Sequence, residues 1–503
     1  MLRMNTERPK EEHGSSDRQD DTVLQNYGYE QVFDRTISKF ASFAVAFSFI
    51  SIATGIFTTY GFVLQSGGPL GIWTWLLVGI GQGAVALVFA ALAARIPLSG
   101  YSYQWGSRLA NPTVGWLLGW LSFSFLSIVV IAVDSTLASQ VLPALLGYES
   151  TTASTQVGTL AVLAVQALLI VFSTRLTAAV NSVAVVAELV GIVLLGVVLF
   201  VVALINGEAD FSNLVDRGTA TGSGYFAFVP IGAFLSSFLL GAFTIVGFES
   251  AANLAEETHE PHKVVPRAMW GAVLSATVLG FLFLVALTVS IGDVGAVTES
   301  ATPVADIVQG ALGGVLGVAF LAFVGVAVFA CGLVIFVTGV RLTWSMSRDG
   351  RFPGHGLFSR VNAATDTPVW ATVLVLGLGI IWTLLIASAA DLFSAATLLP
   401  ALIYAGTVLM YLFTRRRQAE MDLAESEEQR RERFSLGRWE TPVVAVALVW
   451  LALELWILMD AQFRVAQLYV LGMVGVGALY YVFMRLRNPG VLKREPTDPE
   501  EVG

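Results

Sequence analysis

The sequence predicts an all-α membrane protein with twelve transmembrane helices. Of its 503 residues, 55% are hydrophobic and only 13% are charged, whereas soluble proteins carry roughly 25% charged residues. Runs of about 20 apolar residues, long enough to cross a bilayer as helices, recur along the whole chain. Lys and Arg residues gather in alternate loops between these runs, which predicts both the number of spans and their direction.

Prolines and basic residues define the ends of the spans. Proline breaks the helical hydrogen-bond ladder, and of the 16 prolines only Pro400 falls deep inside a span. With a cytoplasmic N-terminus, all 28 Lys and Arg residues except Arg217 and Arg464 lie on the cytoplasmic side. We therefore expect a multi-pass protein of the cytoplasmic membrane with both termini inside. The expected spans are about 38–65, 69–95, 113–143, 155–174, 177–205, 230–256, 268–291, 312–345, 368–388, 391–414, 441–460 and 464–485.

The segments outside the spans are polar. Residues 1–36 and 488–503 are expected to be cytoplasmic tails, the first disordered and without a signal peptide. Residues 415–440 form a charged loop that suits the negatively charged cytoplasmic leaflet. His259 and His262 lie among carboxylates in another such loop, and we expect them to be solvated rather than to bind a metal. The composition predicts no nucleic-acid partner and no cofactor.

Two spans have small and polar residues at their centres. These are residues 51–57 around Gly55 and residues 244–250 around Gly247. The two spans are five helices apart, so units of five helices would cross the membrane in opposite directions. Broken helices at matching places in such an inverted repeat mark a binding site. We expect a first repeat at 37–206, a second at 207–414, and helices 11 and 12 outside them at 441–487. Gly79 and Gly83, in the second span, are expected to allow close helix packing instead.

Four stretches resemble the amino acid–polyamine–organocation superfamily of secondary transporters, in the expected order between about residues 38 and 414. The continuation Thr58-Thr59-Tyr60-Gly61 is most similar to its amino acid/choline branch. The four stretches are Ser51–Phe57; Gly100–Trp105 with Asn111, Pro112 and Gly115; Gly247–Ser250 with Glu256–Thr258, Pro261 and Val265–Arg267; and Arg341 with Ser347–Gly350, Pro353 and Thr367–Pro368.

The resemblance implies a leucine-transporter-type fold and a backbone binding site for an amino acid. A break frees amide groups at the positive end of the following half-helix, which attracts an anion. The family pattern implies that a substrate carboxylate meets the backbone of Thr54, Gly55 and Ile56, and the hydroxyl of Thr54. It also implies that an ammonium meets carbonyl groups in both breaks and that an aromatic ring covers the solute. These positions are Ser51, Ile52, Phe243 and Val246, with Phe243 as the ring and Gly247 at the second break.

Three acidic residues lie inside expected spans, where an ionisable group is costly and therefore a functional candidate. Glu249 follows the second break, as a structural anchor or as a proton-sensitive gate. Glu188 replaces a basic residue that the family often has there, and it either couples ion movement or pairs with a polar group on helix 1 or 8. Asp134, in the outer part of helix 3, contacts a substrate cation or reaches the interface. At the inner end of helix 8, Arg341 and Asp349 are expected to form intracellular salt bridges.

The sequence thus predicts secondary active transport of an amino acid or related small amine by alternating access, coupled to protons or another ion. Exchange of an amino acid for a polyamine remains an alternative, as does a transporter-like membrane sensor. No GxxxxGK[ST] motif is present, so ATP is not expected to drive the process. An enzyme would need a nucleophile–base or metal cluster, and the four histidines all lie outside the centres of spans.

Overall fold

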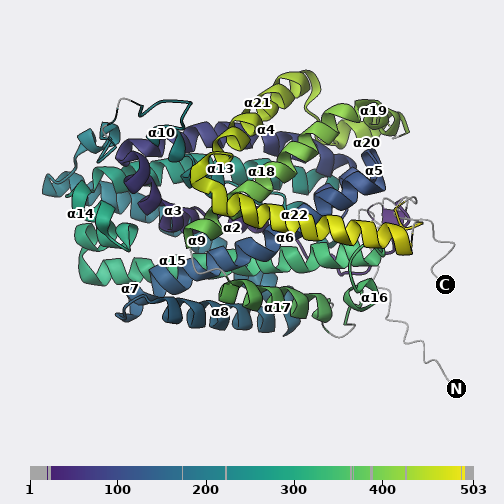
Figure 1. Ribbon diagram of the computed structural model, residues 1–503, viewed down its shortest axis with the longest axis horizontal. Coiled ribbons are helices and arrows are strands. Elements are labelled where there is room, and N and C mark those ends of the chain that lie inside the picture. The colour runs from purple at the N-terminus through teal and green to yellow at the C-terminus, as the bar shows by residue number, and fades with distance from the viewer. Residues whose placement is uncertain are drawn as a thin grey trace.

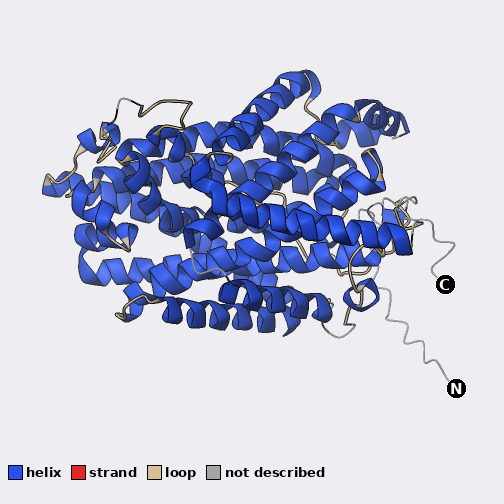
Figure 2. Cartoon of the chain, viewed as in Figure 1, coloured by secondary structure: helices blue, strands red, loops and turns tan. Residues whose placement is uncertain are grey.

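The computed structural model describes residues 20, 24–25, 27–172, 174–220, 222, 224–362, 365, 367–385, 389–424, 427–488 and 490–492. Within these ranges the chain is helical, without a strand (Figure 2). Two isolated bridges, Ile37 with Thr258 and Asn362 with Thr367, are the only β-type pairings among the described residues. Most of the expected tails, residues 1–19 and 493–503, lies outside them.

Each expected span coincides with one helix or with a run of shorter ones. The helices of the spans are α2 (Lys39–Ile50) with α3 (Ile52–Gly67); η1 (Pro69–Trp73) with α4 (Thr74–Arg95); α6 (Pro112–Thr136) with the π-helical η2 (Leu137–Val141) and α7 (Leu142–Leu146); α8 (Thr152–Phe172); α9 (Thr174–Asn206); α10 (Ala233–Ser236), α11 (Leu239–Thr244) and α12 (Ser250–Asn253); α13 (Pro261–Val289); α15 (Pro303–Arg348); α17 (Val369–Leu385); α18 (Ala389–Phe413); α21 (Glu440–Leu458); and α22 (Arg464–Arg487).

Ten helical segments of the described chain are long and apolar enough to cross a membrane. The other two expected spans contain shorter apolar helices, Ala233–Thr244 and Val369–Leu385. The first is short because that span is broken, and residues 386–388 at the end of the second lie outside the described chain. Helix α15 begins earlier than expected, and Gly313, with φ 76° and ψ 172°, interrupts it near its start.

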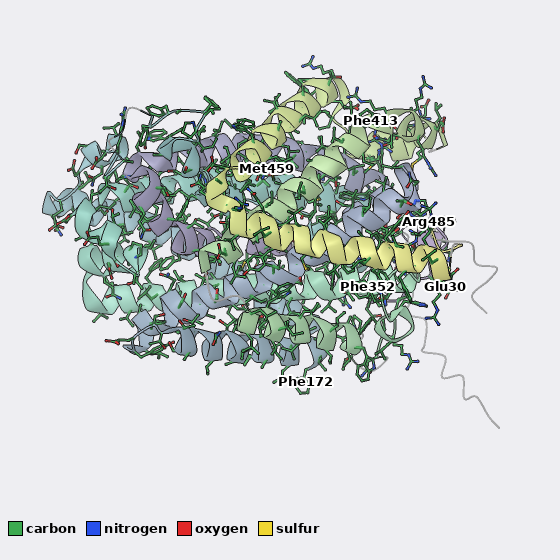
Figure 3. All side chains as sticks on the ribbon, in the orientation of Figure 1. Glu30, Phe172, Phe352, Phe413, Met459 and Arg485 are labelled. Carbon is green, nitrogen blue, oxygen red and sulfur yellow. The ribbon has the colours of Figure 1, made fainter. Side chains whose placement is uncertain are left out.

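Short helices, in the loops or at the ends of spans, gather at the two ends of the molecule (Figure 1). Helices α5 (Tyr101–Leu109), α16 (His355–Phe358), α19 (Arg415–Ala424) and α20 (Glu427–Glu432) lie at one end. Helices α7, α10 and α14 (Val294–Glu299) lie at the other. These are the two sets of loops that the charge pattern assigns to opposite sides of a membrane. In Figure 3, Glu30 and Arg485 lie at the α5 end.

The peripheral helices present apolar side chains to their surroundings. Phe172 at the end of α8 is 69% exposed, and Phe413 at the end of α18 is 80% exposed (Figure 3). Exposed leucines and valines also line α9, α13 and α22. A soluble protein rarely exposes so continuous an apolar surface. The arrangement is that of a multi-pass membrane protein.

The two broken helices cross at their breaks. Ser51 separates α2 from α3 with φ 36°, and Gly247 lies in the gap between α11 and α12 with φ 80°. A Cβ atom on Gly247 would overlap the ring of Phe49, and one on Gly55 would overlap the side chain of Thr244. Each break therefore packs directly on the other. The first break lies four residues before Gly55, so Gly55 serves the contact between helices rather than the change of direction.

Helix α4 carries both glycines that the sequence assigns to close packing. Gly79 has this role, because a Cβ atom there would overlap Thr277 of α13. Gly83 does not, because nothing lies within 4 Å of the position its Cβ atom would take.

This difference gives a matched test of the crossing. We expect Gly55→Ala and Gly247→Ala each to destabilise the protein by about 1–3 kcal/mol through overpacking, with further strain at Gly247 from its left-handed backbone. Gly83→Ala should be neutral or stabilising, since alanine is the better helix former. Thermal unfolding of the purified variants in one detergent measures the effect. Equal melting temperatures for all three would contradict the close crossing.

Candidate functional site

A carboxylate occupies the start of the second half of the first broken helix. Glu188 of α9 is buried, and its Oε1 accepts hydrogen bonds from the Ser51 hydroxyl at 2.9 Å and the Ala53 amide at 3.1 Å. The Ile52 amide donates to the same carboxylate. A hydrogen bond to a charged group contributes roughly 1.5–3 kcal/mol, and the helix dipole adds to the attraction. The sequence placed an anion here, and in the structure an internal side chain takes that position.

The remaining amides of the first turn of α3 are also engaged. The Thr54 amide donates to the Ser51 hydroxyl at 3.2 Å, and the Gly55 amide donates to the Ser51 carbonyl at 3.0 Å. Ile56 lies further inside the continuous helix. The backbone groups that the family pattern assigns to a substrate carboxylate therefore already have partners within the chain in this conformation.

The second break is held by a tyrosine from α18. The Gly247 amide donates to the Tyr404 hydroxyl at 2.9 Å, and this hydroxyl donates to Glu249 Oε2 at 2.7 Å. The Phe243 carbonyl therefore loses the partner that a continuous helix would give it. The Val246 amide turns back to the Thr244 carbonyl at 2.9 Å. Glu249 is thus joined to the break through Tyr404.

Phe243 lies beside the second break with its ring against another aromatic ring. It is 5% exposed, and its centroid is 5.3 Å from that of Phe393 on α18, at an interplanar angle of 60°. Edge-to-face pairs of this kind add stability beyond the buried area. The ring that the sequence singles out therefore belongs to an aromatic pair.

Asp134 is a residue of α6, and its side chain lies against α8 and α15. Gln166 Nε2 of α8 donates to its Oδ1 at 2.8 Å. A Cβ atom on Gly332 of α15 would overlap both side chains. Asp134 is fully buried, so it does not reach the interface, and its hydrogen-bond partner lies on α8 rather than in either break.

Cys331 connects Asp134 with the first break. This buried thiol, the only cysteine of the chain, donates to the Phe49 carbonyl at 3.3 Å and lies beside the Thr54 hydroxyl. It is within electrostatic range of both Glu188 and Asp134. The thiol is therefore a natural reporter of access to the centre of the molecule.

Two ion pairs close the α5 end of the molecule below the breaks. Arg341 of α15 makes a two-pronged contact with Glu257, with Nε to Oε1 at 2.7 Å, and both side chains are buried. Arg348 makes a similar contact with Glu256 at 2.9 and 3.1 Å. Because Glu256 and Glu257 follow α12 directly, these pairs fasten the second broken helix to α15. The expected participation of Arg341 in such a salt bridge agrees with this geometry.

Asp349 has mainly hydroxyl partners instead. Its carboxylate accepts from the Tyr29 hydroxyl at 2.9 Å and the Tyr103 hydroxyl at 2.6 Å, while Arg348 Nε lies 3.9 Å away. Burial raises the pKa of the Tyr29 hydroxyl above its ordinary value, and the neighbouring Asp349 raises it further. Tyr29 therefore donates its proton in this bond as a neutral phenol.

Residues 27–37, which we call the N-terminal strap, cover these ion pairs. The Arg341 guanidinium lies 4.0 Å from the ring centroid of Phe33, and that of Arg348 lies 3.7 Å from the ring of Tyr29. The Thr36 and Ile37 amides donate to the Glu257 carbonyl at 3.0 and 2.9 Å. Sequence reasoning made residues 1–36 a disordered tail. For residues 27–36 this was wrong, because their aromatic rings find buried cations to cover.

Sequence reasoning also missed two polar partners. Tyr404 lies one turn after Pro400, the only proline deep inside an expected span. Gln166 is an amide within an apolar span. Both signals were present, since a polar group at bilayer depth must find a partner, but only the fold identifies Glu249 and Asp134 as those partners.

Comparison with known proteins gives one consistent result. Residues 37–479 match the family model described as amino acid permease. The amino-acid permease BAT1 of Arabidopsis thaliana is 27% identical over 381 residues, covering 70% of this chain and 73% of its own. Amino-acid permease 2 of Neurospora crassa is 29% identical over 373 residues, covering 71% and 68%. An uncharacterised amino-acid permease of Schizosaccharomyces pombe is 29% identical over 369 residues, covering 71% and 67%.

Cys331 allows the closure at the α5 end to be tested. Removing one partner of a buried ion pair costs about 3–5 kcal/mol, so Arg341→Gln should favour conformations open at that end. We expect a small hydrophilic thiol reagent to label Cys331 at least about tenfold faster, which corresponds to 1.4 kcal/mol. Arg360→Gln is the control, because Arg360 is exposed. Equal labelling rates in the two variants would show that this ion pair does not hold the end closed.

Proposed function

Because the chain belongs to the amino acid permease family, we propose that it moves an amino acid or a related small amine across the cytoplasmic membrane by alternating access. The transport is secondary and coupled to protons. The broken helices cross at the substrate site, and the ion pairs at the α5 end separate this site from the cytoplasm.

The proposal includes a twelve-span inverted-repeat architecture with both termini in the cytoplasm. The repeats comprise residues 37–206 and 207–414, followed by the loop 415–440 and the helices within 441–487. Reciprocal packing of Gly55 on Thr244 and Gly247 on Phe49 supports a pseudosymmetric pair of breaks. The gathering of alternate loops at opposite ends supports the direction of the spans.

The observation that carries the mechanism is the Glu188 carboxylate on the start of α3. A substrate carboxylate seeks the same amide groups, because they form the positive end of a half-helix. Two carboxylates cannot share one such site while both are ionised, since like charges at close range repel strongly. The arriving substrate therefore displaces Glu188, which takes up a proton and becomes neutral.

This exchange couples the substrate to a proton. Without a proton, displacement would leave Glu188 as a buried charge without compensation, at a cost of several kcal/mol. With a proton, the carboxylic acid remains hydrogen-bonded in an apolar setting. The substrate carboxylate and the proton therefore bind together and cross together, as symport requires.

The other half of recognition lies at the second break and near the end of α2. An ammonium group needs carbonyl oxygens whose helical partners are missing, and the turn of the Gly247 amide toward Tyr404 frees the Phe243 carbonyl in this way. The Val246 carbonyl belongs to the proposed amine site as well. The carbonyl groups of Ser51 and Ile52 keep their helical partners, so they would accept from the ammonium with the second lone pair of each oxygen. Phe243, paired with Phe393, forms an apolar wall beside it.

Release to the cytoplasm requires the closed end to open. The contacts of Arg341 with Glu257 and of Arg348 with Glu256 must separate, together with the strap over them. Both glutamates come just after α12, at the closed end, so the second broken helix is the element that moves against α15.

Exchange of an amino acid for an amine is the second candidate, and one observation favours it. The amide groups that would bind a substrate carboxylate are already filled. A polyamine without a carboxylate would leave Glu188 in place and would cross without a coupled proton. The two modes therefore differ in their dependence on a pH gradient.

Reconstituted uptake distinguishes these modes. Purified protein in liposomes is offered labelled amino acids, γ-aminobutyrate, polyamines and choline, with and without an imposed pH gradient. The proposal requires accumulation of at least one carboxylate-bearing member that depends on the gradient. If no member of the panel is taken up or bound, the proposed substrate class is wrong.

Glu188→Gln tests the coupling. The amide side chain keeps an oxygen that can accept from the amides of α3, but it cannot gain or lose a proton. We expect the variant to equilibrate substrate by counterflow while losing accumulation driven by the pH gradient. Glu454→Gln is the matched control, because Glu454 is also buried and lies on α21, where Gln82 of α4 is its neighbour. Unchanged pH dependence and concentrative uptake in Glu188→Gln would refute this role.

A further inference from the structure

A second buried carboxyl group, Asp134, pairs with an amide in an incomplete hydrogen-bond arrangement. Gln166 Nε2 donates to Asp134 Oδ1 at 2.8 Å and to the Phe329 carbonyl of α15 at 3.2 Å. These two bonds use both hydrogens of the amide nitrogen. They also fix the orientation of the amide, because a flipped side chain would place its oxygen against the Phe329 carbonyl.

The two remaining oxygens of the pair have no partner. Asp134 Oδ2 and Gln166 Oε1 are both buried and without a hydrogen bond, and both residues are fully buried. Two acceptors cannot satisfy each other. One proton on Asp134 Oδ2 removes the conflict, because a carboxylic acid and a primary amide form two complementary hydrogen bonds. In such a pair the single added proton would give both oxygens a partner.

The surroundings favour the neutral acid over a carboxylate. On the elements packed around Asp134, the titratable side chain that faces it is Cys331 of α15, and Glu188 of α9 lies beyond that thiol. Helix α8 contributes Gln166, and α3 contributes the Thr58 hydroxyl, which bonds to Thr136 at 2.9 Å. Among the residues that the structure describes, no basic group acts on Asp134. An ionised Asp134 would be a buried charge with a single side-chain donor.

A pocket with many hydroxyl side chains in its wall lies on the α7 side of the pair, although neither Asp134 nor Gln166 is among its lining residues. Its volume is about 220 Å³, and it opens between α6, α8 and the end of α17. Ser135 follows Asp134 directly, and Thr159 precedes Gln166 by about two turns of α8. The pocket is lined mainly by hydroxyl and amide side chains, which suit water molecules: Ser135, Ser139, Ser150, Thr151, Thr152, Thr155, Gln156, Thr159 and Thr383.

We propose that Asp134 and Gln166 form a proton-binding site, in which a neutral carboxylic acid pairs with the amide and exchanges its proton with solvent through this pocket. The transport role rests on the proposed function: the site carries a second coupled proton beside that of Glu188. The pocket lies at the α7 end, so the proton enters from the side opposite the closed end. This role replaces the contact with a substrate cation that the sequence suggested for Asp134.

Occupancy of the site is measurable without transport. In purified protein, the infrared carbonyl stretch of a protonated carboxylic acid should be present near neutral pH and lose intensity in Asp134→Asn. The variant should fold, because an asparagine amide can donate to Gln166 Oε1 in place of the acid proton. Asp306→Asn, at an exposed position near the start of α15, should leave the band unchanged. Equal spectra for wild type and Asp134→Asn would overturn the proposal.

A glycine pair tests the geometry without removing either polar group. The Cβ atom of Gly332→Ala would lie 2.6 Å from Gln166 Nε2, so the acid–amide pair must separate and its band must shift. In Gly339→Ala, two turns along the same helix, the nearest atom is Leu126 Cβ at 3.5 Å, an ordinary contact. Identical spectra in these two variants would contradict the pairing.

Coupling is measured by the number of protons that move with each substrate, obtained from reversal potentials in liposomes. We expect Asp134→Asn to lose one coupled proton while it still binds substrate. An unchanged stoichiometry, or lowered affinity confined to cationic substrates, would overturn the transport role. If the wild-type protein moves no substrate, the proposed function fails, while the infrared result still decides whether the site holds a proton.

Discussion

The structure depends on one constraint, which is that every backbone amide and carbonyl inside a membrane needs a partner within the protein. Breaking a helix at mid-membrane frees several such groups at once. At the first break the Glu188 carboxylate and the Ser51 hydroxyl take the amides of α3. At the second, the Tyr404 hydroxyl accepts a hydrogen bond from the Gly247 amide and donates one to the Glu249 carboxylate. The acidic residues at this depth are thus the groups that make breaks possible.

Through these contacts, each break depends for its hydrogen bonds on a side chain from a different part of the chain. Glu188 comes from α9 and Tyr404 from α18, so each satisfies backbone groups on an element to which it is not covalently close. A group held in this way can be replaced by a ligand that offers the same chemistry. A capping side chain within the same helix would be harder for a ligand to replace, because it moves together with the backbone groups that it caps. In the proposed mechanism the site is therefore stable when empty and still able to accept a solute.

The sequence predicted what depends on local composition and missed what depends on distant contacts. The apolar runs, the loop charges and the two polar interruptions were readable, because bilayer thickness and backbone chemistry act on short stretches. The first break lies at Ser51, the start of the predicted segment 51–57, and Gly55 within that segment is needed for packing on Thr244 rather than for its own backbone angles. The sequence offered a pairing of Glu188 with a polar group on helix 1 or 8. The partner, Ser51, lies 137 residues away, and neither its identity nor the geometry of the contact follows from either segment alone. The strap was missed because Tyr29 and Phe33 look like part of a polar tail until the arginines of α15 are brought beneath them.

Water links the closed end to the central carboxylates, because both the separation of the ion pairs and the ionisation of the carboxylates require it. The buried contact of Arg341 with Glu257 separates only if water replaces the lost charge interactions, since neither ion is stable alone in an apolar setting. The strap excludes that water by covering the guanidinium groups with aromatic rings. Once water enters, it also reaches α3, where it lowers the cost of ionising Glu188. In the proposed cycle, opening toward the cytoplasm and release of the proton are therefore consequences of one event, the hydration of a core that is otherwise closed.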